Sequence, residues 1–273
     1  MLTIKEIKDF FLLENSHAKK ELGQNFLIDE TVAKQIVDSV EIKKEDNVLE
    51  IGPGLGALSG FIVGKSIKYS LVEYDQKFVN FLSENFKNYN VNIIKGNILK
   101  YKVFEANKII GNLPYYITTD TILNTIVNYK NLDIAVFMMQ KECYKRITAK
   151  FGSQDYNIIN ILISYLFDVN VILEVKKDKF FPVPKVDSIV VKFVYNGGNR
   201  DLVKPLYLVT RTLFLNKRKV ISTNLNSIVK NKEKTNSIIL SIGLKLNNRA
   251  EELTLQNYIN LTNELLKEGI IKL

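Results

Sequence analysis

A short apolar run that leads directly into a glycine-rich turn constrains the fold of this chain more than any other feature. Residues 47–51 read NVLEI, which is typical of a buried strand, and residues 52–64 read GPGLGALSGFIVG. Gly52, Gly54 and Gly56 permit a tight turn that opens a helix. A buried strand that turns at once into a helix is typical of α/β proteins.

Strands and helices continue to alternate further along the chain. Strand-like runs are expected at 68–73, 91–95, 107–112 and 134–140, and amphipathic helices at 29–40, with Asp29 as the N-cap, and at 75–89. This alternation predicts an α/β fold with a mainly parallel sheet that helices cover on both faces. The unusual residues, which are GPGLG, Glu73, Gly96-Asn97 and NLPYY, all fall at strand ends, where such sheets bind ligands.

The pattern changes after the segment YNGGNRD, residues 195–201, which has the composition of a linker. Beyond this segment the spacing of apolar residues is helical, with short breaks. We therefore expect a sheet domain over residues 1–197 and a small helical domain over residues 198–273.

The composition limits the partners and the kinds of site that this chain can have. The 273 residues include 38 Lys and Arg against 29 Asp and Glu, a net charge of +9 that fits either compositional bias or an anionic partner such as nucleic acid. A single cysteine, Cys143, excludes an internal disulfide and a Cys-based metal cluster, and we expect no metal site.

We expect neither a signal peptide at the N-terminus nor a membrane span, because the most apolar stretch, residues 158–173, is too short and polar to cross a bilayer. We expect a cytoplasmic protein without membrane contact.

The glycine loop indicates a nucleotide-like cofactor. Gly52, Gly54 and Ala57 satisfy the pattern G-x-G-x-x-G/A, and Glu73 lies where an acid that binds ribose hydroxyls belongs. NAD, FAD and S-adenosylmethionine all present a ribose diol, so the loop does not choose among them, and a glycine turn without any ligand is the plainer alternative. No second feature supports hydride transfer, which makes a dehydrogenase the weaker hypothesis.

The tip NLPYY, residues 112–116, favours methyl transfer to an adenine amine. The N6 lone pair of adenine is delocalised into the ring, so an enzyme must position N6 and draw this lone pair out of conjugation. The side-chain oxygen of Asn112 and the carbonyl oxygen of Leu113 could accept hydrogen bonds from N6, with Pro114 stiffening the turn. Tyr115 would stack on the base, Phe180 would stack from the other side, and Tyr116 is interpreted as packing. The alternative for this tip, and for Phe180, is ordinary core packing.

With these residues in hand, the chain resembles the ribosomal RNA adenine N6-dimethyltransferases, in particular their bacterial small-subunit (KsgA/RsmA) type. The resemblance covers nearly the whole chain and rests on ordered motifs: KKELGQNFL (19–27), EIGPGLGALS (50–59), VEYD (72–75), GNIL (96–99), NLPYYI (112–117), FFPVPKVDS (180–188), LFLNKRK (213–219) and NRAEELT (248–254). It implies a Rossmann-like domain that uses S-adenosylmethionine, followed by a small helical domain. The implied product is a pair of adjacent N6,N6-dimethyladenines near the 3′ end of 16S ribosomal RNA, made in the small ribosomal subunit. We expect the enzyme to act as a monomer.

The resemblance also implies roles for particular residues. Segment 1–28 would contribute to the cofactor site through Asn25 and Leu27. Gly52 would lie against the methionine part of the cofactor, Glu73 would hold its ribose hydroxyls, and Asn112 would border both substrates.

Two positions depart from the family pattern. Asn97 stands where the family commonly has an Asp that accepts from the amine of the cofactor adenine, so we expect weaker cofactor affinity. Ser59 stands where the family often has Thr, which has no clear functional consequence.

The basic residues suggest where RNA would bind. The cluster Lys217, Arg218 and Lys219 is the candidate for neutralising RNA phosphates. Two other functions stay open: a large-subunit ribosomal RNA methyltransferase of the antibiotic-resistance type, and a non-catalytic RNA-binding assembly factor on the same fold.

Overall fold

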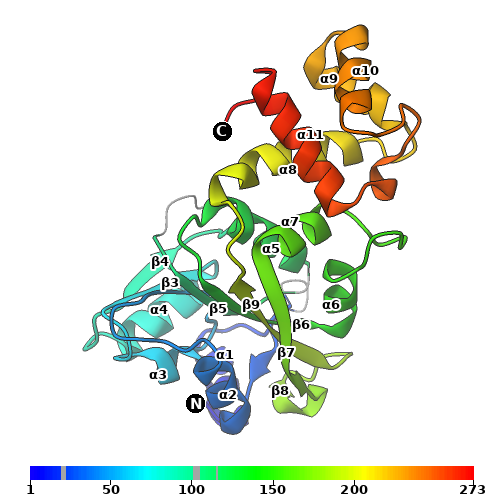
Figure 1. Ribbon diagram of the computed structural model, residues 1–273. Helices are drawn as coiled ribbons and strands as arrows, with labels where there is room; N and C mark the ends of the chain where they lie inside the picture. Colours follow the sequence, from blue (N-terminus) through cyan, green and yellow to red (C-terminus); the bar gives the residue numbers. More distant parts are fainter. Residues whose placement is uncertain (20–22, 101–104, 115) are drawn as a thin grey trace. The chain divides into compact units, whose positions relative to one another are not determined.

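The computed structural model describes residues 1–19, 23–100, 105–114 and 116–273 (Figure 1). The chain separates by its contacts into two compact units, the first formed by residues 1–144 and 169–195 and the second by residues 145–168 and 196–273. The sequence-based division between residues 197 and 198 differs from this arrangement by two residues at the boundary, 196 and 197, and by one longer segment. Residues 145–168 group with the C-terminal helices and not with the sheet.

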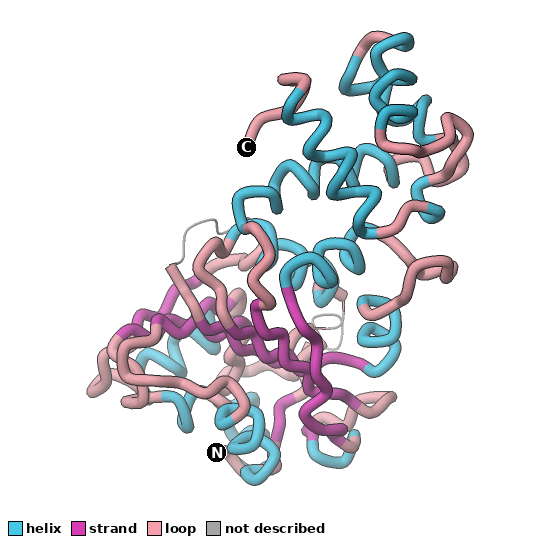
Figure 2. Tube along the Cα trace, in the orientation of Figure 1, coloured by secondary structure: helices cyan, strands magenta, loops and turns pink. Residues whose placement is uncertain are grey.

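The first unit is built around a sheet whose strands are drawn in magenta in Figure 2. The strands are β2 (Asn47–Ile51), β3 (Lys68–Glu73), β4 (Asn92–Lys95), β5 (Lys108–Asn112), β6 (Ile134–Gln140), β7 (Phe167–Val175) and β9 (Ser188–Tyr195). Their order is β4-β3-β2-β5-β6-β9-β7. The strands from β4 across to β6 are parallel, and β9 pairs with β6 in the antiparallel sense. This sheet confirms the predicted Rossmann-like α/β fold.

Six helices precede, connect or follow the parallel strands in the described part of the chain, and the third to fifth of them lie between parallel strands. They are α1 (Ile4–Leu13), α2 (Glu30–Asp38), α3 (Ser59–Ile62), α4 (Gln76–Asn85), α5 (Thr118–Asn128) and α6 (Lys141–Ile147). The predicted N-cap of α2 is confirmed, since the Asp29 side chain accepts a hydrogen bond from the backbone N–H of Val32 at 3.0 Å. Asp75 caps α4 in the same way, accepting from the N–H of Lys77 at 3.1 Å.

The central strands are buried along nearly their whole length, as expected of parallel strands covered on both faces. The close packing of β5 against β2 requires glycine at position 111. A Cβ atom there would lie 2.7 Å from the carbonyl oxygen of Ile51, so only glycine lets β5 approach β2 this closely. The carboxyl ends of these two strands are therefore held together at the edge of the sheet where the site forms.

The second unit is helical. It contains α7 (Ile158–Leu166), α8 (Val203–Phe214), α9 (Ile221–Val229), α10 (Lys232–Ser241) and α11 (Leu255–Lys267), with 3₁₀ turns at η3 (Arg200–Leu202) and η4 (Ala250–Glu252). Helix α7 is apolar on almost every side and packs against α8, which explains why residues 145–168 join this unit. No helix in the described ranges is long and apolar enough to cross a membrane.

A small separate sheet pairs β1 (Phe26–Leu27) with β8 (Phe180–Phe181), which follows the 3₁₀ turn η2 (Lys177–Lys179). In this antiparallel pair Leu27 lies opposite Phe180 and Phe26 lies opposite Phe181. Phe180 is 2% exposed and packs in the main hydrophobic core with Leu27 and Val175. In this arrangement the Phe180 ring packs in the core, and the stacking role that the sequence suggested for it stays a prediction.

A buried carboxyl group ties the glycine loop to the sheet. Glu50, in β2, is 1% exposed. Its Oε2 accepts hydrogen bonds from Ser59 Oγ at 2.8 Å and from the Tyr69 hydroxyl. Burial raises the pKa of Glu50 to about 7, against the effect of these two hydrogen bonds, and nearby Glu73 adds to the rise. Glu50 lies in β2, just before the glycine loop, and Ser59 begins α3, just after it. The hydrogen bond between them therefore links the two ends of the loop.

Replacing Phe180 with Ala is expected to lower the free energy of unfolding by about 3–5 kcal/mol, because the substitution opens a cavity in the core. Phe181→Ala is the matched control, since Phe181 is half-buried in the same strand, and its loss should be clearly smaller. Urea denaturation followed by circular dichroism measures both. A Phe180→Ala protein as stable as the unsubstituted chain would contradict the core assignment.

The raised pKa of Glu50 predicts a pH-dependent stability. The unfolded chain ionises this group near pH 4.5, whereas the folded protein keeps it protonated up to about pH 7. Stability that is fully present below pH 4.5 is therefore lost as the pH rises through 7, by about 3 kcal/mol in all. Glu50→Gln cannot ionise, so urea titrations from pH 4.5 to 8 should show a smaller decline in this variant. Equal declines in the two proteins would rule out Glu50 as the source.

Candidate active site

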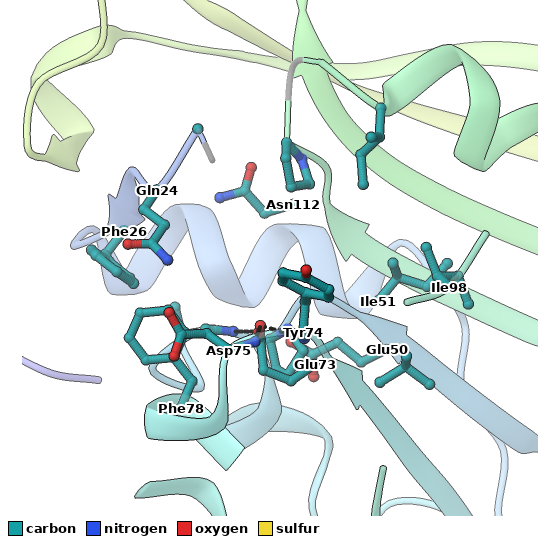
Figure 3. Close-up of a pocket in the computed structure, with 18 of the residues that line it drawn as sticks. Gln24, Phe26, Glu50, Ile51, Glu73, Tyr74, Asp75, Phe78, Ile98 and Asn112 are labelled. Carbon is teal, nitrogen blue, oxygen red and sulfur yellow. Dashed lines mark hydrogen bonds between the residues drawn. The ribbon is translucent and has the colours of Figure 1, made fainter. Parts of the chain in front are cut away.

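A cavity of about 380 Å³ opens at the carboxyl ends of the parallel strands of the first unit (Figure 3). Its volume falls within the range of roughly 300–1,000 Å³ that is usual for ligand and cofactor sites. Its wall comes from segments far apart in sequence, including residues 23–27, 50–54, 72–75 and 96–98. The residues predicted to bind a cofactor all line it: Asn25, Leu27, Gly52, Gly54, Glu73, Asn97 and Asn112.

The glycine loop forms the part of the wall that follows β2. Gly52 and Gly54 have φ angles of +64° and +55°, a region that residues with side chains rarely adopt. A Cβ atom at Gly54 would lie 3.2 Å from the ring of Phe26, which lines the same cavity. Glycine is therefore needed at this position both for the turn and for the close approach of the N-terminal segment.

Glu73 lies at the end of β3 and is 7% exposed. Its Oε2 accepts a hydrogen bond from the N–H of Gly54 at 3.0 Å. Its Oε1 accepts from the N–H groups of Tyr74 and Asp75 at 2.7 and 2.9 Å. Burial raises the pKa of Glu73, and these hydrogen bonds act against the rise. Oε1 already accepts two hydrogen bonds, whereas Oε2 accepts one and keeps a second lone pair, so the carboxyl group can still accept a hydrogen bond from a hydroxyl of a ligand.

Asn112 ends β5 and is half-buried at the cavity wall. Its Nδ2 donates a hydrogen bond to the backbone carbonyl oxygen of Asn25 at 3.2 Å. Because a carbonyl oxygen requires a donor, this contact fixes which end of the amide faces the N-terminal segment and leaves Oδ1 for another partner. Asn25 thus meets Asn112 through its backbone, while its own side chain donates to the carbonyl oxygen of Gly23.

The turn after Asn112 is closed by local hydrogen bonds. Leu113 is buried, and its N–H donates to the carbonyl oxygen of Met138 at 3.1 Å. The carbonyl oxygen of Pro114 accepts from the N–H of Ile117 and from Thr118 Oγ1, which joins the turn to the start of α5. Tyr115, the predicted stacking residue, lies outside the described residues.

Several aromatic residues line the cavity that sequence reasoning did not assign to it. Phe26 and Phe78 are buried, whereas Tyr74 and Tyr116 are 63% and 57% exposed. The interpretation of Tyr116 as a packing residue is therefore wrong. Burial of its hydroxyl raises the pKa of Tyr116, and the neighbouring Tyr74 and Glu73 add to this effect. In the sequence, Tyr74 directly follows Glu73 and Tyr116 directly follows NLPY. This adjacency is the one sequence signal that places the two tyrosines near the site.

The basic cluster predicted to bind RNA belongs to the second unit. Lys217, Arg218 and Lys219 are exposed in the turn that follows α8. The Lys217 ammonium lies 5.4 Å from the centre of the Phe214 ring and 3.5 Å from the carbonyl oxygen of Tyr156. These residues do not line the cavity.

Comparison with known proteins places these features in a family. Residues 15–267 match the family model described as ribosomal RNA adenine dimethylase. The chain is 35% identical, over 257 residues, to a protein of Mycoplasma capricolum subsp. capricolum named ribosomal RNA small subunit methyltransferase A. That alignment covers 90% of this chain and 97% of the relative. The protein of the same name from Mycoplasmopsis pulmonis is 39% identical over 212 residues, which are 76% of this chain and 83% of the relative.

Solved structures agree on the fold. A dimethyladenosine transferase from Plasmodium falciparum superposes with a TM-score of 0.75 at 23% identity, covering 89% of this chain and 98% of the other. The 23S rRNA methyltransferase ErmE gives a TM-score of 0.62 at 19% identity, covering 88% and 99%. The family match spans nearly the whole chain and includes every segment of the cavity wall. This chain therefore belongs to the ribosomal RNA adenine dimethylase family, as the resemblance of its motifs predicted.

Proposed function

We propose that this chain transfers methyl groups from S-adenosylmethionine to the N6 atoms of two adjacent adenines near the 3′ end of 16S ribosomal RNA in the small subunit. The observation that carries the proposal is the Asn112 amide, which is fixed by the Asn25 carbonyl group at the wall of a cavity that also contains Glu73. Curated relatives named for methylation of small-subunit ribosomal RNA support the choice of RNA.

The residues of the cavity fit an adenosine-containing cofactor. The glycine loop lines the cavity with backbone alone at Gly52 and Gly54, and Glu73 offers a buried carboxyl group for ribose hydroxyls. Gly52 would lie against the methionine part, with Asn25 and Leu27 forming the wall on the N-terminal side. When bound, S-adenosylmethionine supplies a methyl group on a sulfonium, which is electrophilic enough that the adenine amine needs no prior deprotonation.

The task left to the protein is to hold N6 and to localise its lone pair. Asn112 Oδ1 and the Leu113 carbonyl oxygen would accept hydrogen bonds from the two N6 hydrogens, which favours a pyramidal and more nucleophilic nitrogen. The amide of Asn112 is already oriented for this by its bond to Asn25. The Pro114 carbonyl bonds to α5 keep the turn stiff, and Tyr115 would stack on the base.

The exposed Lys217, Arg218 and Lys219 would contact RNA phosphates through the helical unit. Such contacts position the RNA without reading its sequence, and they weaken as salt rises. We propose that the enzyme acts as a monomer in the cytoplasm, where small subunits are assembled.

The direct test of this function is to incubate the protein with labelled S-adenosylmethionine and undermethylated small or large subunits, and then to map the label. Dimethylated adenines near the 3′ end of the small-subunit RNA are expected. Label on large-subunit RNA would show a different substrate, and the absence of label from both would favour a non-catalytic assembly factor.

Asn112→Ala is expected to lower the rate of methyl transfer by at least about 10²-fold, because it removes an acceptor that is oriented before the reaction. Binding of RNA should stay close to that of the unsubstituted chain. Single-turnover transfer of labelled methyl groups and filter binding measure the two quantities. Asn85→Ala is the control, since Asn85 is an exposed asparagine that bonds within its own helix, and it should change neither. An Asn112→Ala protein with full activity would overturn the role of Asn112.

A further inference from the structure

The order of the strands determines where the base of a bound nucleoside lies. Strand β3 stands between β2 and β4, and Glu73 ends β3. A nucleoside whose ribose bonds to Glu73 and whose 5′ substituent runs to the glycine loop after β2 must extend its base toward β4. The residues after β4 that line the cavity are Gly96, Asn97 and Ile98.

Asn97 is therefore the polar side chain of this segment that meets the edge of the base, and its amide has a determined orientation. Asn97 Oδ1 accepts a hydrogen bond from the backbone N–H of Leu99 at 2.9 Å. An N–H group needs an acceptor, so the oxygen and not the nitrogen of the amide must face Leu99. The same turn is closed by the N–H of Lys100, which donates to the Asn97 carbonyl oxygen at 2.9 Å.

The remaining atom of the amide, Nδ2, can only donate hydrogen bonds. Within the described ranges, no residue accepts a hydrogen bond from it. An aspartate in the same position would use one oxygen for Leu99 and offer the second oxygen as an acceptor. Asparagine and aspartate thus present opposite hydrogen-bonding groups to a ligand.

We infer that Asn97 weakens selection for the 6-amino group of the cofactor purine and shifts the preference of the site toward a 6-oxo purine, relative to an aspartate at this position. The 6-amino group of adenine donates hydrogen bonds, and a second donor facing it leaves both unpaired. The 6-oxo group of hypoxanthine accepts, and it pairs with the Asn97 amide. Hypoxanthine also carries a hydrogen on N1, which adenine lacks, but this difference is the same for an asparagine and an aspartate at position 97 and cancels when the two proteins are compared. This inference rests on the proposed function, because it assumes that the cavity binds an S-adenosyl cofactor.

The test compares S-adenosylhomocysteine with S-inosylhomocysteine, its 6-oxo analogue, by titration calorimetry on the full chain and on Asn97→Asp. For each protein the ratio of the two dissociation constants is measured. In Asn97→Asp the ratio should shift by about tenfold or more toward the adenosyl ligand, which corresponds to one mismatched hydrogen bond. The ratio is taken within one protein, so a change in stability or in overall affinity cancels.

Asn97→Ala separates recognition of the base from support of the turn. It removes the Leu99 hydrogen bond, which affects both ligands, and the donor, whose loss affects the 6-oxo ligand alone, so binding of the inosyl ligand should weaken more than binding of the adenosyl ligand. The same ratio in the unsubstituted chain and in Asn97→Asp would overturn the inference while leaving the proposed cofactor intact. Failure of both ligands to bind the unsubstituted chain would instead overturn the proposed cofactor and the inference with it.

Discussion

The burial of the Glu73 carboxyl group at the end of β3 is the constraint on which the rest of the site depends. A carboxyl group removed from water is costly unless donors surround it, and here the donors are backbone N–H groups of Gly54, Tyr74 and Asp75. One side chain therefore fixes the glycine loop, the end of β3 and the start of α4 relative to one another. The N-terminal segment joins the same arrangement through Lys19, whose ammonium lies 3.2 Å from the Asp75 carboxylate.

Features that depend on local pattern could be predicted from the sequence. Apolar runs bounded by turns located the central strands, and a single Asp before an amphipathic stretch located the cap of α2. The convergence of the glycine loop, Glu73 and Asn112 at one edge also followed from the sequence, because parallel strands in such a sheet share the end at which ligands bind.

Features decided by segments distant in sequence could not be predicted in this way. Phe180 and Phe181 are adjacent aromatics on a strand, and only their register against β1 decides which ring enters the core. The apolar pattern of helix α7 is compatible with packing against the sheet or against the C-terminal helices. In the structure α7 packs against α8. Tyr116 faces the cavity because the turn after Asn112 closes onto α5, which no periodicity reveals. The orientation of the Asn97 amide likewise depends on a hydrogen bond within its turn, donated by the N–H of Leu99.

The pairing of β1 with β8 also sets the order in which the site can be completed. Phe26 forms part of the cavity wall, and its strand is held by residues 180–181, near the end of the first unit. During synthesis the glycine loop and Glu73 leave the ribosome well before β8 does. A nascent chain that ends before residue 180 thus contains the glycine loop and Glu73 but lacks β8, the strand that pairs with β1 and holds Phe26 in the cavity wall. The complete cavity wall therefore depends on a contact of long sequence separation, which can form only after residues 180–181 have been synthesised.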